Sequence, residues 1–301
     1  MNDRLIDISE SAAVLTLENG LLVIHPDGKP KETVPIDEIA AIVTSHRGVV
    51  FTQSLVAALG KAGTVLICCD ERHLPSSMLL PVESHYTQAE RFRAQAEARL
   101  PVKKRIWQEL VRAKLGMQGE VLRLLHGEDA GMAEMARRVR SGDPDNLEAT
   151  AAQRYWPRLF GGAAFRRGNA GDQRNGMLDY GYAVLRAVTA RGICASGLHP
   201  SLGVNHRNRY NAFCLADDLM EPLRPLVDYR VADLCREWPP GEWRLNKTTK
   251  LTLLSIVAGR YAVNSESRSL FDIVARRAQA LASVFLGEKK SFECDPIRIS
   301  R

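Results

Sequence analysis

The sequence lacks the features of a membrane-spanning or exported protein. No apolar run reaches the ~18 consecutive residues that a bilayer crossing requires. The first residues contain no basic stretch followed by an apolar core, so no signal peptide is indicated. We therefore expect a cytoplasmic protein that has no membrane partner.

Cysteine is scarce and irregularly spaced. The six cysteines form no Cys-x-x-Cys pair, and two of them are adjacent inside the apolar run of residues 65–69. Thiols in such positions are typical of reduced, mostly buried side chains. The spacing argues against a disulfide framework and a structural zinc site, and the lack of a His-Glu-x-x-His motif disfavours a zinc hydrolase acting on small molecules.

Acidic residues are unevenly distributed along the chain. Residues 1–80 contain six lysines and arginines against ten aspartates and glutamates, whereas the remainder contains 35 basic and 25 acidic residues. The excess of positive charge therefore belongs to the second part. A polyanion is the natural partner of such a surface, although solubility alone also explains a moderate excess.

Short apolar segments separated by turn signals dominate the first 80 residues. Asn19-Gly20 and Asp27-Gly28 are strong hairpin signals, because these residues accept the positive φ of tight turns. The pattern predicts a short helix over residues 52–61 and strands over residues 5–8, 13–17, 21–25, 32–35, 40–44 and 64–69. A linker is expected at residues 75–85, where two prolines interrupt the pattern.

Helical periodicity takes over after the linker. Amphipathic helices are predicted over residues 88–100, 102–115, 116–126, 132–139 and 147–156. The fold class is therefore α+β, with a small β-rich, sandwich-like domain over residues 1–80 and a larger all-α domain over residues 81–301.

The acidic residues Asp217, Asp218 and Glu221 follow a polar loop and lie on one predicted helix. Positions three and four apart share a helix face, so Asp218 and Glu221, or Asp217 and Glu221, can point at the same spot. Burial there would require a cation, and oxygen ligands beside a histidine suit Mg²⁺ or Mn²⁺. The simpler interpretation is a solvated acidic face near a helix start. Glu148 likewise fits a capping box with Asp145.

Two basic stretches flank these acids. Residues 154–174 are rich in arginine and glycine and contain one acid, and residues 244–260 contain no acid. Guanidinium groups on a glycine-rich loop suit phosphate backbones. The predicted DNA-binding residues are Arg158, Arg166, Arg167, Arg174, Arg244, Lys247 and Lys250.

Four ordered motifs together resemble one known family. They read EATAAQRYW at residues 148–156, NGMLDYGYAVL at 175–185, GLHPSLG at 197–203 and FCLADDLMEPLRP at 213–225. In this order they resemble the universal CRISPR-associated endonuclease and spacer integrase, in the branch that accompanies a single large effector nuclease. The resemblance covers essentially the whole chain.

The resemblance implies a metal-dependent DNA endonuclease and integrase of CRISPR adaptation, in which a spacer 3′-hydroxyl attacks a repeat phosphate. It implies that Glu148, His206 and Glu221 are catalytic ligands of Mg²⁺ or Mn²⁺. Asp218 is expected as a supporting residue or an alternative third ligand, because other branches place an aspartate a few residues earlier. The implied partners are DNA, a second copy joined through the β-rich domains, a small ferredoxin-like CRISPR-associated dimer and the effector nuclease. The rival interpretation is a non-catalytic DNA-binding scaffold.

Overall fold

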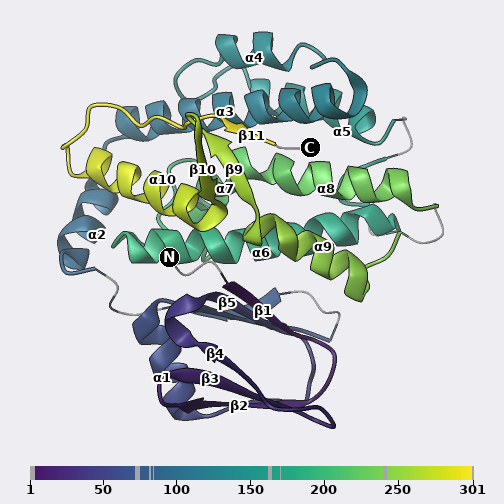
Figure 1. The fold of residues 1–301 in the computed structure, drawn as a ribbon. Coiled ribbons are helices and arrows are strands. Elements are labelled where there is room, and N and C mark those ends of the chain that lie inside the picture. The colour runs from purple at the N-terminus through teal and green to yellow at the C-terminus, as the bar shows by residue number, and fades with distance from the viewer. Residues whose placement is uncertain are drawn as a thin grey trace.

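The computed structural model describes residues 4–71, 75–80, 83, 85–161, 165–169, 171–239 and 243–299. A β-rich part formed by the first 80 residues packs beneath a larger, mainly helical part (Figure 1). The mixed α+β fold predicted from the sequence is confirmed. Among the helices of the described ranges, none combines the length and the apolar character of a membrane span.

The β-rich part consists of two four-stranded sheets and one helix. One sheet has the strand order β1-β5-β7-β8, and the other has the order β4-β3-β2-β6. The helix α1, Gln53–Ala62, contacts both sheets. The strands are β1 Arg4–Ile8, β2 Ala13–Glu18, β3 Leu21–Pro26, β4 Glu32–Pro35, β5 Ile39–Thr44, β6 Val49–Phe51, β7 Val65–Cys69 and β8 Pro75–Leu79, with the 3-10 turn η1 at Ile36–Glu38.

Strand β5 is buried along its full length because both faces of its sheet are covered. Ile39 and Ile42 belong to the core between the two sheets, whereas Ala40 and Val43 belong to the core shared with the helices. Its parallel neighbours β1 and β7 complete the centre of that sheet. An uninterrupted apolar run is the pattern expected of a strand buried on both faces.

The predicted linker is wrong in its first half, since Pro75–Leu79 forms the edge strand β8 antiparallel to β7. A proline is tolerated there because it is the first residue of an edge strand. Residues 81–82 and 84 of the predicted linker lie outside the described residues. The domain boundary at residue 80 stays a prediction.

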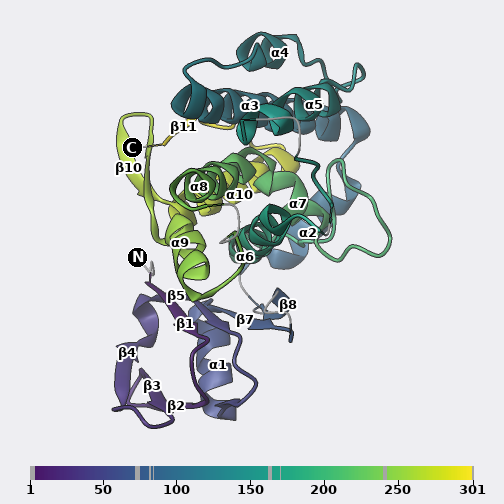
Figure 2. The same cartoon turned by 90° about the vertical axis from the view of Figure 1, so that its right-hand side faces the viewer.

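The helical part is not all-α, which corrects the sequence prediction. A three-stranded sheet with the order β10-β9-β11 lies on its surface (Figure 2). Asn264 and Ser265 form the turn of its hairpin with positive φ angles of 48° and 69°. The strands are β9 Arg260–Val263, β10 Glu266–Ser269 and β11 Ile297–Arg298.

The remaining elements are helical, and the two predicted helices over residues 102–126 form the single helix α3. Their bounds are α2 Gln88–Glu97, α3 Leu100–His126, α4 Met132–Arg138, α5 Leu147–Leu159, α6 Gln173–Ala195, α7 Cys214–Met220, the 3-10 turn η2 Glu221–Leu223, α8 Arg224–Glu237, α9 Lys247–Ala258 and α10 Leu270–Phe285.

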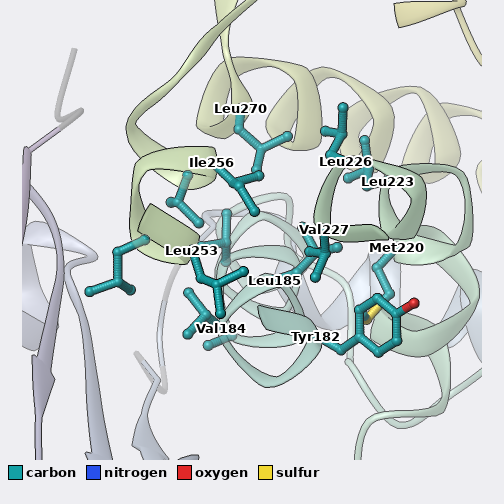
Figure 3. Packing of buried hydrophobic residues seen from close by; sticks show 14 of the residues in the cluster. Tyr182, Val184, Leu185, Met220, Leu223, Leu226, Val227, Leu253, Ile256 and Leu270 are labelled. Carbon is teal, nitrogen blue, oxygen red and sulfur yellow. The ribbon is translucent and has the colours of Figure 1, made fainter. Parts of the chain in front are cut away.

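Helix α6 is the centre of the helical part, with contacts to α7, α8, α9, α10 and strands β7 and β8. Gly181 permits its close approach to α8, because a Cβ there would lie 2.5 Å from Cγ1 of Val227. Tyr182 and Leu185 of α6 pack with Met220, Val227 and Leu253 (Figure 3). This core fixes α7, η2 and α8 relative to α3, and the site lies among these elements.

Candidate active site

Lys114 of α3 lies between two carboxylates from distant parts of the chain. Its Nζ is 2.6 Å from Oε1 of Glu148 and 2.6 Å from Oε2 of Glu221. Only 13% of the lysine side chain is exposed. Burial lowers the pKa of Lys114, but the charges of Glu221 and Glu148 outweigh this effect and raise the pKa above its ordinary value. The two carboxylates therefore converge on one buried cation.

Glu148 is placed by the start of α5. The carboxylate of Asp143 accepts hydrogen bonds from the backbone N–H groups of Leu147 at 2.9 Å and Glu148 at 3.0 Å. The predicted capping box is wrong, because Asp145 forms an ion pair with Arg140 at 2.7 Å instead. The side chain of Glu148 is therefore free to contact Lys114.

Glu221 begins the turn η2, where α7 ends and a proline follows. Its Oε1 accepts a hydrogen bond from Nε of Arg224 at 2.7 Å. Its Oε2 is buried, and Nζ of Lys114 at 2.6 Å is its charged partner. Burial raises the pKa of Glu221, but Lys114 and Arg224 outweigh it, and the carboxyl is held ionised.

Asp218 holds the loop that carries His206. The carboxylate of this fully buried residue accepts backbone N–H groups from Val204, Asn205 and His206 at 2.6, 3.0 and 3.1 Å. It also lies 2.6 Å from Nδ1 of His206. Since a carboxylate only accepts, Nδ1 carries the proton. This hydrogen bond, opposed by burial, raises the pKa of His206, and Nε2 remains the ring nitrogen available to a ligand.

Gly203 allows this loop to fold tightly against α7. A Cβ at this position would overlap the backbone oxygen of His206 and lie 2.9 Å from Oδ2 of Asp218. The sequence motif GLHPSLG therefore ends at a residue that the geometry of His206 requires. His199 in the same motif has a different partner, since its Nδ1 contacts the hydroxyl of Ser201.

Asp217 has partners that the other two acids do not share. It pairs with Arg186 at 2.7 Å and accepts a hydrogen bond from Asn211 at 2.7 Å. Of the two expected pairs, Asp217 and Glu221 share no cation among the described residues, whereas the charges of Asp218 and Glu221 both raise the pKa of His206. All three are buried, so the interpretation as a solvated acidic face is wrong, and each has its own cationic or polar partners.

A buried hydrogen-bonded group adjoins the site through Arg224. Asp228 of α8 accepts hydrogen bonds from the hydroxyls of Tyr155, at 3.0 Å, and Tyr182. Burial raises the pKa of Asp228 to about 6. The guanidinium of Arg224 lies 4.7 Å from the centre of the Tyr182 ring, so this group also fixes the partner of Glu221.

The arrangement fits a divalent cation in part. Among the described residues, no three His, Cys, Asp or Glu side chains converge closely enough to form a metal cluster. The oxygens of Glu148 and Glu221 nevertheless converge on a single cationic nitrogen, and Oε2 of Glu221 is a buried acceptor without an aligned donor. His206, with Nδ1 bound to a carboxylate, has the arrangement common to metal-ligating histidines.

Comparison with known families settles the membership of this chain. The family model of the CRISPR-associated protein Cas1 matches residues 6–238, which is most of the sequence. The chain belongs to the Cas1 family. The resemblance read from the four sequence motifs is thereby confirmed.

Relatives and solved structures agree with this Cas1 assignment. The chain is 38% identical over 227 residues to a protein of Neisseria meningitidis serogroup C (strain 8013) named CRISPR-associated endonuclease Cas1, covering 75% of this chain and 74% of the relative. A casposase bound to integration product has a similar fold, with a TM-score of 0.79, 19% identity and coverage of 96% and 92%. A chain of a Cas6-RT-Cas1–Cas2 complex gives a TM-score of 0.74 at 15% identity, covering 97% of this chain and 36% of that chain.

The predicted DNA-binding residues of this Cas1-family chain differ in exposure. Arg158, Arg166 and Arg244 are exposed, whereas Arg167 pairs with Asp179 and Lys247 pairs with Glu10.

Two of the predicted DNA-binding residues contact other side chains of the fold and are largely buried. Arg174 pairs with Asp172 at 2.6 Å and lies over the rings of Phe160 and Trp243. Lys250 is 5% exposed and lies over the ring of Tyr180. Neither is placed to reach a phosphate, which corrects the prediction for these two residues.

Sequence reasoning missed Lys114, Arg224 and a basic surface beside His206. The signal for Lys114 was present, because it stands four residues after Leu110 and four before Gln118, both on the buried face of α3. The basic surface contains Lys103 and Arg207: burial lowers the pKa of Lys103, and the nearby charge of Arg207 lowers it further. Two like charges held close beside the loop of His206 suit a phosphate.

Proposed function

We propose that this chain is a metal-dependent DNA endonuclease and integrase that inserts new spacer DNA into a CRISPR array by attack of a 3′-hydroxyl on a phosphodiester. The observation that carries the proposal is the convergence of Glu148 and Glu221 on one buried cation, beside a histidine that a buried aspartate orients. Carboxylate pairs of this kind bind divalent metal ions at phosphoryl-transfer sites.

The ligand roles follow from which atoms of these side chains contact Lys114 alone or have no partner among the described residues. Oε1 of Glu148, Oε2 of Glu221 and Nε2 of His206 would hold Mg²⁺ or Mn²⁺. Asp218 supports His206, because its oxygens are occupied by the loop backbone and the ring. Arg224 holds Oε1 of Glu221 and so orients Oε2. When bound, the metal supplies charge stabilisation to the attacking and leaving oxygens of the displacement.

The DNA backbone is proposed to contact exposed basic residues of the helical part. Arg166 and Arg244 form no ion pair with a carboxylate of the described ranges, and Arg158 is exposed as well. Lys103 and Arg207 extend this surface next to His206. Arg167 and Lys247 would have to exchange an exposed carboxylate partner for phosphate.

The proposed assembly contains a second copy, a small ferredoxin-like partner and, as a further partner, the effector nuclease. The fold shared with a chain of a Cas6-RT-Cas1–Cas2 complex supports a Cas2-like partner. The exposed apolar pair Val14 and Val50, which face each other in register on β2 and β6, supports contact between β-rich parts.

Strand transfer of a short duplex with 3′-hydroxyl ends into a plasmid carrying a CRISPR repeat tests the proposal, in the presence of the bridging partner protein. We expect joining in Mn²⁺ or Mg²⁺, none in EDTA, and loss in His206→Ala and Glu221→Ala. Joining that survives Glu221→Ala would contradict the ligand assignment. Tight DNA binding without joining under any metal would favour a non-catalytic scaffold, which should also ignore Glu148→Ala.

The salt dependence of DNA affinity tests the proposed surface. Charge reversal of Arg166 and Arg244 should weaken binding and flatten the dependence of affinity on salt, because each lost phosphate contact reduces counter-ion release. Lys250→Met is the matched control, since this lysine is buried away from solvent. An equal loss in the control would show that the effect comes from the fold and not from phosphate contacts.

A further inference from the structure

The carboxylates of the candidate site are neutralised by the chain itself. Glu148 and Glu221 contribute two negative charges, and Lys114 and Arg224 contribute two positive charges. Arg224 contacts only Oε1 of Glu221, whereas Lys114 contacts both carboxylates. Within the described part of the chain, Lys114 is the one cation in an ion pair with Glu148.

The ammonium group and a divalent metal cannot both occupy this position. Metal–oxygen distances for Mg²⁺ are about 2.0–2.1 Å, so a metal held by the same two oxygens would overlap the place of Nζ. Two cations at such a separation also repel strongly. Lysine can leave, because its charge is a point charge on a flexible four-carbon stem. Arg224 can remain, since it holds a different oxygen.

We propose that Lys114 is an internal counter-ion that a divalent metal must displace, and that it holds Glu148 and Glu221 together in the metal-free protein. The inference rests on the metal dependence proposed above. Its consequence is a weaker affinity for metal than the two carboxylates alone would give. After exchange, the carboxylates, the metal and Arg224 carry a net charge of one positive unit, which suits a DNA phosphate.

Calorimetric titration of the full chain with Mn²⁺ tests this role in Lys114→Met. We expect Lys114→Met to bind Mn²⁺ at least about tenfold more tightly than the unmodified chain, because a close competing charge is removed. In EDTA its thermal midpoint should fall, and Mn²⁺ should raise it by more than in the unmodified chain. Lys104→Met is the matched control on an exposed position of the same helix and should change neither quantity.

An unchanged or weaker affinity for Mn²⁺ in Lys114→Met would overturn the inference. If that variant does not fold, labelling of the unmodified chain with an amine-reactive ester provides the second measurement. Mn²⁺ should increase labelling at Lys114 and leave Lys104 constant, and no increase at Lys114 would refute displacement.

The same titration separates this inference from the proposed function. Mn²⁺ binding that depends on Glu148 and Glu221 but not on Lys114 refutes only the counter-ion role. Binding by neither the unmodified chain nor Lys114→Met refutes both. Binding by Lys114→Met alone would show that Lys114 blocks the metal without yielding to it, which refutes both displacement and metal use by the natural sequence.

Discussion

Replacing Asp218 by asparagine should release His206 without removing it. Four donors share the two oxygens of Asp218: Val204 and Asn205 donate to Oδ2, and the backbone and ring of His206 donate to Oδ1. An asparagine keeps one oxygen and places an amide, itself a donor, where the other was. Two of the four donors must then lose their acceptor.

The magnitude follows from the burial of these groups. A buried donor without an acceptor costs about 1–3 kcal/mol. Two of them give roughly 2–6 kcal/mol, and the lower half of this range applies because Asn205 is exposed and can find water. A histidine that loses its orienting carboxylate typically also binds metal about 10–100-fold more weakly. We therefore expect Asp218→Asn to lose about 3 kcal/mol of unfolding free energy as well as metal affinity.

Denaturant unfolding in EDTA and calorimetric titration with Mn²⁺ measure the two effects separately. Asp217→Asn is the control, because this neighbouring buried carboxylate binds Arg186 and Asn211 and does not contact His206. It should lower stability while leaving metal affinity nearly intact. The reasoning is refuted if Asp218→Asn leaves both quantities unchanged, or if both variants weaken metal binding equally.

Two further predictions concern the loop and the buried tyrosine pair. Gly203→Ala should destabilise the fold by about 1–3 kcal/mol, because its Cβ would meet backbone that no rotamer change can move. The same variant should bind Mn²⁺ more weakly. An unchanged thermal midpoint and an unchanged affinity for Mn²⁺ would contradict this prediction. Asp228 has a folded pKa of about 6 against an ordinary 3.8, so the folded state holds the extra proton and stability should fall by up to about 3 kcal/mol as pH rises from 4 to 6. Denaturant unfolding at several pH values should show that the unfolding free energy of the unmodified chain falls relative to that of Asp228→Asn as pH rises from 4 to 6. A difference in unfolding free energy that does not change with pH would refute the prediction.

Local signals were enough to predict the two hairpins of the β-rich part. The turns at Asn19-Gly20 and Asp27-Gly28 have the expected positive φ at Asn19, Gly20 and Gly28, and they fix the antiparallel pairing of β2, β3 and β4. The parallel pairing of β5 with β1 and β7 was not predicted. Such pairing depends on packing between segments far apart in the sequence, which no local pattern encodes.

The chemistry of the site was only partly accessible from the sequence. Residue spacing grouped Asp217, Asp218 and Glu221 on one helix, but α7 ends at Met220, so Glu221 turns with η2 toward another partner. The partners Arg186, Lys114 and Arg224 come from three different helices. Tertiary packing decides which carboxylate meets which cation, and spacing along one helix cannot predict it.

This division of partners explains how the site can be ordered before a metal arrives. Arg224 orients one oxygen of Glu221, Asp218 orients His206, and Asp143 places Glu148 through the start of α5. Each of these supporting contacts uses atoms that a metal would not need. Among the ion pairs of the described residues, only those of Lys114 involve oxygens of both Glu148 and Glu221. If the chain binds a metal as proposed, the metal would have to break these contacts of Lys114 and could leave the supporting contacts intact.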